Sequence, residues 1–417
     1  MKHKVLILGA GFAGIQLAKN LNHDDFDILL IDKINHHQFQ PLFYQVATSQ
    51  IEPSSISFPI RNIFRHQKNI QIRLTEAKTI DPAEKKVSTD IGDFYYDSLV
   101  IAIGCTTNFF GNTQIQEHAL TLKSTAEAIS IRNHVLKTFE AIISSDEQHR
   151  EALLNLVIVG AGPTGVELAG AFAEIKQHVL PKDYPKIDFS RFNITLVEGS
   201  AHTLNNMSEA SKKDSENYLK NMGVRLISST FVKSYDGTEL LLSNGESIRS
   251  KTVIWAAGVT PNTIEGLPPE IVTPGKRLIV DRYNTVKDCP DIYAIGDIAY
   301  METPLYPKGH PQVANVAINQ AKNLAKNLKH QLKKEALKPY EYKDLGSMAT
   351  IGRNKAVVDV GKLHLKGYPA WLIWMFLHLM LILSVKNKLI IFINWAWTYI
   401  TKDSSLRLIL TPSKKSS

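Results

Sequence analysis

The 417-residue sequence has only two cysteines, Cys105 and Cys289, and they lie far apart in the chain. This excludes the disulfide framework of a small secreted protein and leaves no spacing for a cysteine-rich zinc site, so we expect no metal. A disulfide reductase needs a close redox-active cysteine pair, which is missing, and sulfide oxidation would also need more cysteines. We therefore expect both cysteines to be small packing residues.

Acidic residues are scarce near the C-terminus, where tryptophan is concentrated. From residue 369 to the end, six Lys and Arg side chains stand against one acid, Asp403, and four of the five tryptophans lie between Trp371 and Trp397. The whole chain has a formal net charge of +8. Because most of that excess lies among apolar residues of this tail, it favours an anionic membrane surface as partner and not nucleic acid.

The N-terminus lacks the features of a targeting segment. Residues 1–4 lead directly into an apolar run of about four residues that ends in glycines, with no long apolar core and no cleavage site. The run predicts a buried strand that enters a turn.

One strand–turn–helix pattern occurs twice. An apolar run precedes Gly9, Gly11 and Gly14, and a second precedes Gly160, Gly162 and Gly165. Each copy is followed by a polar hairpin, at Gly92 and Gly245, and then by a buried strand that ends at Gly104 or Gly258. These features keep nearly one offset, which makes the pair far more specific than one G-x-G-x-x-G. The duplication predicts an α/β fold with two Rossmann-type domains.

Each glycine turn has the chemistry of a dinucleotide site. The first glycine permits the tight turn, the second lets the backbone approach a pyrophosphate, and the third lets the helix pack on the strand. The helix N-terminus attracts the phosphates. Asp32 and Glu198 end the following strands, where a carboxylate accepts hydrogen bonds from ribose hydroxyls. Because Glu198 would repel a 2′-phosphate, we expect NADH over NADPH.

Two dinucleotide sites in one chain suggest a flavin and a nicotinamide, with the second module inserted into the first. The segment 277–297 reads as a strand that ends at Gly296 and Asp297. Here the chain resembles the glutathione-reductase-like flavoproteins, which place such an aspartate against the ribityl chain of FAD. The resemblance assigns FAD to residues 1–115 and 265–330, and NADH to 150–264.

The tail leaves three interpretations open. Residues 369–385 are 17 nearly continuous apolar residues, about 25 Å as a helix, and a second apolar stretch follows Lys386 and Lys388. A membrane span needs about 20 residues. Two short apolar helices flanked by Trp and Lys favour a position in the membrane interface. A buried core or dimer helix and a single span are the alternatives.

The chain also resembles the type II NADH dehydrogenases, single-subunit NADH:quinone oxidoreductases that do not pump protons. The match runs nearly end to end and includes "HHQFQPLFYQVAT" at 36–48, "GPTGVELAG" at 162–170, "WAAGVTPN" at 255–262 and "NWAWTYIT" at 394–401. It implies a connecting helical segment at 116–149, a substrate-site region at 331–368 and a membrane-anchoring tail at 369–417 that does not cross the bilayer.

The resemblance also assigns roles to residues. It implies FAD contacts at Thr48 and Asp297, and it places Glu167 beside the nicotinamide and the flavin, where burial would raise the pKa of a proton-handling carboxyl. In "PQVANVAINQAKN" the family has two glutamines where this chain has Asn315 and Asn319. The shorter amides put the quinone contacts of this helix in doubt.

The sequence therefore predicts that hydride passes from NADH to FAD and that two electrons then reduce a membrane quinone, ubiquinone or menaquinone. A soluble ferredoxin-type reductase or an NADH oxidase is the alternative. We expect a homodimer, peripherally attached to the cytoplasmic face of a bacterial inner membrane.

Overall fold

The computed structural model describes residues 2–403 and 406–410, and the chain forms two compact units. The first unit comprises Met1–Gln38, Phe58–Thr106 and Val259–Lys343. The second comprises Phe39–Ser57, Thr107–Gly258 and Asp344–Ser417. Each unit is assembled from three separate stretches, because the chain passes back and forth between them.

The first unit contains an eight-stranded sheet whose centre is parallel. Its order is β23-β20-β21-β22-β9-β1-β2-β5. The parallel strands that frame the first glycine turn are β1 (His3–Leu8), β2 (Phe26–Asp32), β5 (Ile70–Leu74) and β9 (Ser98–Ile101). A separate three-stranded sheet, β6 (Ala77–Asp81), β7 (Lys86–Thr89) and β8 (Gly92–Tyr95), includes the expected hairpin at Gly92.

The segment 277–297 differs from the single strand expected of it. It forms β20 (Leu278–Val280), β21 (Thr285–Val286) and β22 (Cys289–Ala294), and β23 (Ala299–Met301) follows a 3-10 turn at Gly296–Ile298. The chain reverses at Asn284 and at Asp288, which both adopt positive φ. Asn and Asp tolerate this conformation better than most residues, so two tight turns divide the apolar run into three pieces.

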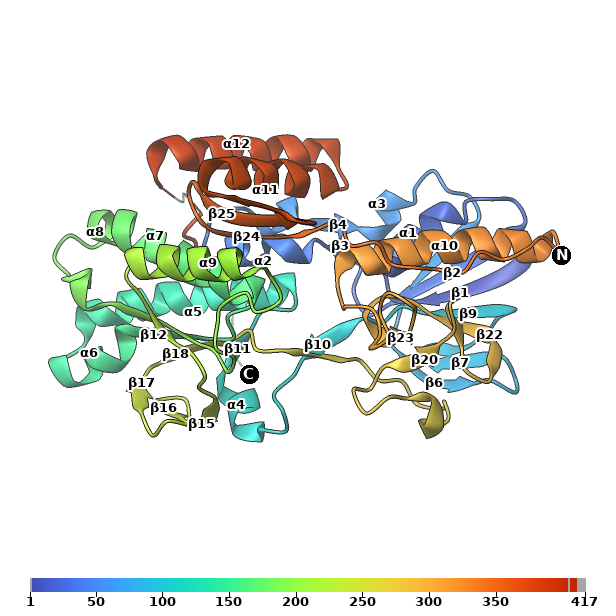
Figure 1. Cartoon of the computed structure of the whole chain (residues 1–417), viewed down its shortest axis with the longest axis horizontal. Helices are drawn as coiled ribbons and strands as arrows, with labels where there is room; N and C mark the ends of the chain where they lie inside the picture. The colour runs from blue at the N-terminus through green and yellow to red at the C-terminus, as the bar shows by residue number, and fades with distance from the viewer. Residues whose placement is uncertain (1, 404–405, 411–417) are drawn as a thin grey trace, which may run out of the picture. The chain divides into compact units, whose positions relative to one another are not determined.

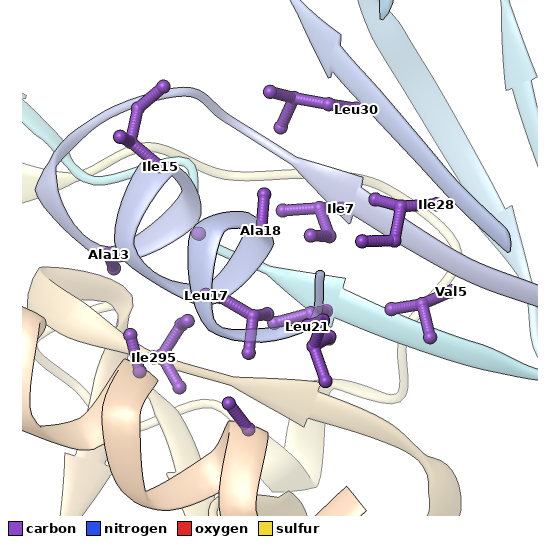
Figure 2. Close-up of a cluster of buried hydrophobic side chains, with 14 of the residues drawn as sticks. Val5, Ile7, Ala13, Ile15, Leu17, Ala18, Leu21, Ile28, Leu30 and Ile295 are labelled. Carbon is purple, nitrogen blue, oxygen red and sulfur yellow. The ribbon is translucent and has the colours of Figure 1, made fainter. Parts of the chain in front are cut away.

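Two helices cover one face of the parallel sheet. α1 (Phe12–Asn20) follows the first glycine turn, and α10 (Ala314–Leu332) packs beside it. Figure 2 shows Leu17 and Ala18 of α1 among Ile7 of β1 and other side chains of a continuous buried cluster. The apolar residues of α1 recur at helical spacing, and this explains why one side of the helix is buried. The helix start, and with it the glycine turn, is thereby held against the sheet.

The second unit is built on a five-stranded parallel sheet. Its order is β11 (Leu120–Thr121), β18 (Thr252–Trp255), β12 (Asn155–Val159), β13 (Asn193–Val197) and β14 (Val224–Ile227). Its main helices are α5 (Thr125–Ser144), α7 (Pro163–His178) and α9 (Glu209–Asn221), with short α4 (Thr113–His118) and α6 (Glu147–Leu153). A three-stranded sheet contains the second expected hairpin: β15 (Val232–Tyr235), β16 (Glu239–Leu242) and β17 (Ser247–Arg249). The two hairpins complete the predicted duplication.

The C-terminal residues form a layer on the second Rossmann domain. β24 (Ser347–Gly352), β25 (Lys355–Val360) and β26 (Leu363–Lys366) make an antiparallel sheet that contacts α7. Gly170 of α7 permits this packing, since a Cβ there would collide with the Ile351 carbonyl of β24. α11 (Gly367–Leu381) and α12 (Val385–Thr401) run side by side over β24 and β25 (Figure 1).

The units divide the chain differently from the expected ranges, for example at residues 39–57 and 116–149. Residues 39–57 lie within the expected FAD range 1–115 but belong to the second unit. Their short helix α2 (Phe43–Ala47) is wholly buried and contacts α5 and α7. The expected connecting segment 116–149 likewise joins the second unit, where α5 contacts β11 and β18. Burial of apolar side chains, and not chain order, sets these boundaries.

The two C-terminal helices expose most of their apolar side chains. In α11 only Ala370 and Trp374 are buried, and in α12 only Ile391 and Trp395. The alternative of a buried core helix is therefore wrong for the single chain. Among the residues that the structure describes, no helix is both long enough and apolar enough to cross a membrane.

Candidate active site

The two glycine turns have the same construction. Gly9 and Gly160 adopt φ of +101° and +100°, and a Cβ on either would collide with the neighbouring strand end, at Ala102 or at Ala256. Gly14 and Gly165 each face the carbonyl oxygen of the first glycine of their own turn. The first and third glycines of each turn therefore leave no room for a side chain, because the backbone packs against them.

The middle glycine of each turn borders open space. A Cβ added at Gly11 or Gly162 would meet no atom within 4 Å. Both residues are the N-cap of a helix, α1 or α7, and neither cap is satisfied by a side chain. Backbone N–H groups at a helix start beside an open surface are what a pyrophosphate needs. Both turns therefore fit a dinucleotide.

The two carboxylates at the strand ends organise these turns. Asp32 accepts hydrogen bonds from the backbone N–H groups of Ala10, at 2.6 Å, and Ile34, at 2.9 Å. Glu198 accepts from the Ala161 N–H at 2.6 Å and from Ser200. Burial raises the pKa of Asp32, and its backbone hydrogen bonds oppose that shift. Each carboxylate is fixed beside its glycine turn and keeps lone pairs for a ribose.

Asp297 lies where β22 ends, within the first unit. Its backbone carbonyl accepts from the Gln312 amide at 3.1 Å, and the preceding Gly296 N–H donates to the buried Gln320 side chain at 2.8 Å. Its Oδ2 accepts from the Cys105 thiol at 2.8 Å. The expectation that Cys105 only fills space is therefore wrong, because it orients the carboxylate proposed to meet FAD. Cys289 is buried, as expected.

A narrow cavity of about 70 Å³ lies between α7 and the C-terminal layer. Every lining residue belongs to the second unit. Tyr44 and Gln45 come from α2, Glu167 and Glu174 from α7, Thr350 from β24, and aromatic residues close it from α11 and α12: Trp371, Trp374, Trp395 and Tyr399. Aromatic side chains with polar groups set among them are typical of a site for a flat ligand that also forms hydrogen bonds.

Glu167 is the strongest acid–base candidate in this cavity. Only 8% of the residue is exposed, and burial raises the pKa of its carboxyl group to about 8. The Thr350 N–H, 3.5 Å away, and the Trp374 indole oppose the shift. The carboxyl group is therefore mainly protonated at neutral pH, and it can act as a proton donor.

Polar groups around the cavity are arranged by the helices that line it. The Trp395 indole donates to Gln45 at 2.8 Å, and the Gln45 amide donates to the Tyr44 hydroxyl at 2.9 Å. Burial, and then the charge of Glu167, raises the pKa of Tyr44, so its phenol stays neutral. The Trp374 indole nitrogen is buried without a hydrogen bond of normal geometry to any described residue. The indole still interacts with the Glu167 carboxyl group, whose pKa it lowers.

The histidine of the tail packs in this region. The His378 ring stacks on Trp374, with centroids 4.0 Å apart, and its Nδ1 contacts the Trp374 carbonyl at 2.8 Å. Burial lowers its pKa to about 4, so the ring is neutral. His378 therefore packs as a neutral ring against Trp374.

The remaining predicted residues occupy both units. Thr48 is buried in the second unit, and its hydroxyl donates to the Tyr44 carbonyl at 2.7 Å. Gly104 of the first unit and Gly258 of the second follow strand ends with φ of +66° and +81°. Asn315 and Asn319 lie half-buried in the first turns of α10, and the described cavity lining includes neither. Glu167 is thus the one proposed catalytic residue in that lining.

The sequence analysis missed most of the cavity. Tyr44, Gln45, Thr350 and Trp374 come from three distant parts of the chain. A usable signal was present in "GVELAG", where a carboxylate and a glycine lie on an otherwise apolar helix. Gly170 marks the close approach of β24, which buries Glu167.

Two known protein families match most of this chain. Residues 3–321 match the pyridine nucleotide-disulphide oxidoreductase family, and residues 345–402 match the NDH2 C-terminal domain. The type II NADH:quinone oxidoreductase Ndh of Mycobacterium tuberculosis is 34% identical over 96% of this chain and 89% of its own length. The chain belongs to the type II NADH:quinone oxidoreductases. This confirms the resemblance on which the sequence analysis relied.

More distant relatives agree with this membership. The mitochondrial internal alternative NAD(P)H-ubiquinone oxidoreductase A1 of Arabidopsis thaliana is 28% identical over 96% of this chain and 84% of its own length. The structure of NDH2 from Plasmodium falciparum in complex with NADH superposes with a TM-score of 0.88 at 22% identity, covering 97% of this chain and 100% of that one. The predicted fold class, two Rossmann-type domains with a C-terminal helical segment, is confirmed.

Proposed function

We propose that this chain is an FAD-dependent NADH:quinone oxidoreductase that pumps no protons. The overall reaction converts NADH, one proton and a quinone into NAD⁺ and a quinol. When bound, FAD takes up hydride from NADH and supplies two electrons to the quinone. The observation that carries the proposal is the aromatic cavity with a protonated carboxyl group, Glu167, on its wall.

The two glycine turns divide the cofactors between the units. The turn of the first unit holds FAD, and its contacts are Gly9, Gly11, Gly14, Asp32, Gly104, Gly296 and Asp297. The family resemblance alone supports a flavin contact at Thr48. The turn of the second unit holds NADH through Gly160, Gly162, Gly165, Glu198 and Gly258. Glu198 selects NADH, because its carboxylate, fixed beside the second glycine turn, would repel a 2′-phosphate.

Glu167 supplies a proton to the quinone as it is reduced. Its raised pKa keeps the proton in place at neutral pH, and a developing negative charge on the quinone oxygen draws it away. The Trp374 N–H, which also interacts with Glu167, orients a quinone carbonyl, and Tyr44 and Trp395 exclude water. The family resemblance alone supports quinone contacts at Asn315 and Asn319, whose amides are shorter than the glutamines usual in the family.

The exposed apolar side chains of α11 and α12 attach the enzyme to one membrane face. Phe376, Val385, Phe392 and Ile400 are between 52% and 82% exposed. Burying such side chains in the interface contributes about 25 cal/mol per Å². We propose that this is the cytoplasmic face of a bacterial inner membrane, because bacteria generate NADH in the cytoplasm. We also propose that the enzyme is a homodimer. Light scattering of the detergent-solubilised enzyme tests the dimer.

A direct assay tests the function. The FAD-loaded enzyme receives NADH with a water-soluble quinone, with a ferredoxin, or with oxygen alone. We expect rapid NADH oxidation only with the quinone. Equal or faster turnover with ferredoxin or oxygen would instead support the soluble reductase or oxidase.

A further inference from the structure

A second, larger cavity lies at the C-terminal end of α12, within the second unit. Its volume is about 370 Å³. The basic side chains that line it come from three segments: His178 at the end of α7, Arg353 and Lys355 around the turn from β24 to β25, and Lys402 directly after α12. Segments distant in sequence thus bring their cations to one concave surface.

The protein balances the charges of these cations only in part, because Arg353 and Lys355 act on a single carboxyl group in the described lining, that of Glu174. Arg353, Lys355 and Lys402 form no ion pair within 4.0 Å with any carboxylate that the structure describes; the Arg353 guanidinium donates to the Thr398 carbonyl at 3.1 Å and lies over the Tyr399 ring. Glu174 is the single acidic residue in the described lining, and burial raises its pKa. The cavity therefore has a net positive charge that an anion would balance.

The same cations also act on the His178 ring. Burial lowers its pKa most, and the charges of Arg353, Lys402 and Lys355 lower it further, together with Lys182 on the neighbouring helix. Four cationic side chains from separate elements therefore act on one ring. An anion bound among them would reduce this repulsion.

The cavity also has an unused hydrogen-bond acceptor. Asn354 forms the tip of the turn from β24 to β25, with φ of +60°. Its side-chain oxygen is buried and has no partner among the described residues. A ligand that carries a hydroxyl donor beside its anionic group would satisfy both features of the site.

The place of the cavity identifies the ligand class. Lys402 and Tyr399 lie at the end of the helix whose exposed apolar residues include Trp397 and Ile400. We propose that this cavity binds the phosphate headgroup of an anionic phospholipid whose acyl chains lie along the apolar face of α12. The inference rests on the proposed attachment to a membrane. Because Arg353, Glu174 and Tyr399 line both cavities, the lipid borders the quinone cavity.

The test uses short-chain phosphatidylglycerol below its micelle concentration, titrated calorimetrically into the full-length FAD-loaded enzyme in detergent. We expect one binding site per chain and at least about tenfold weaker binding in the double variant K355Q/K402Q. The matched control is K386Q/K388Q, which removes the same charge from the first turn of α12, outside the cavity. We expect its affinity to stay within about twofold of the parent.

Two further arms separate the alternatives. Phosphatidylcholine of the same chain length, which has no net charge, should bind much more weakly, and inorganic phosphate should bind more weakly than the lipid. Equal affinity for inorganic phosphate would assign the site to a free anion and overturn the lipid proposal. An equal loss in both double variants would overturn it too, because the effect would then be general charge. If the parent reduces quinone but does not bind phosphatidylglycerol, this inference alone fails.

Discussion

Replacing Glu167 with Gln removes one titrating proton from the quinone cavity and preserves the size of the side chain. The carboxyl pKa is about 8 in the folded protein and about 4.5 when exposed. Between these values the folded chain holds a proton that the unfolded chain has released. The free energy of unfolding of the parent therefore falls as the pH rises, by about 1.4 kcal/mol per pH unit from this group.

The sign and size of this effect define a measurement. The contribution of Glu167 to stability is fully present below about pH 4.5 and is lost as the pH rises through 8. Over two pH units, from 5 to 7, it falls by about 3 kcal/mol. E167Q has no carboxyl group to titrate at this position. The free energy of unfolding of E167Q minus that of the parent should therefore increase by that amount between pH 5 and pH 7. Chemical denaturation of both proteins across this range tests it.

The control is Glu117→Gln, which makes the same change at an exposed position of α4 in the same unit. Its difference from the parent should be small and nearly independent of pH. If the difference in unfolding free energy between E167Q and the parent is equally independent of pH, Glu167 is not held protonated in the folded chain and the reasoning is refuted.

The same variant tests the catalytic role. Proton donors of this kind commonly contribute 100-fold or more to turnover. We expect E167Q to lower kcat by about this factor while FAD remains bound. Parent turnover should decline as the pH rises through 8, and this decline should be absent in E167Q. Unchanged steady-state rates in the variant would exclude the proposed role.

Three further predictions concern other parts of the enzyme. Glu198→Ala should raise kcat/KM for NADPH relative to NADH, because it removes a fixed negative charge beside the ribose; a parent that already uses both equally contradicts this. Gly170→Ala places a Cβ against the Ile351 carbonyl, so it should destabilise the protein by about 1–3 kcal/mol and raise the quinone KM as β24 shifts; thermal unfolding and kinetics measure both, and an unchanged Tm argues against close packing. Replacing Phe392 and Ile400, 52% and 78% exposed, with Ser should weaken sedimentation with vesicles and lower turnover with long-tailed quinones more than with water-soluble ones; undiminished vesicle binding would show that α12 is not the anchor.

Local patterns predicted the repeated framework well. The strand, glycine turn and helix at Gly9 and at Gly160 depend on residues within about 30 positions of each other, and apolar spacing and glycine sterics act at that range. The strands of segment 277–297 are harder to predict from the sequence. Its division into three strands depends on Asn284 and Asp288 adopting positive φ, which the residue types permit but do not require.

The sequence by itself determined the two dinucleotide turns, the carboxylates that follow them and the apolar tail, because short-range periodicity and charge express all three. Only the tertiary structure decided what surrounds Glu167. Tyr44, Thr350 and Trp374 reach it from separate segments, and the desolvation that raises its pKa is a property of their combined packing. The hydrogen bond from the Cys105 thiol to Asp297 and the basic cavity at Lys402 also depend on the tertiary structure. No local sequence pattern predicts which distant side chains will come into contact.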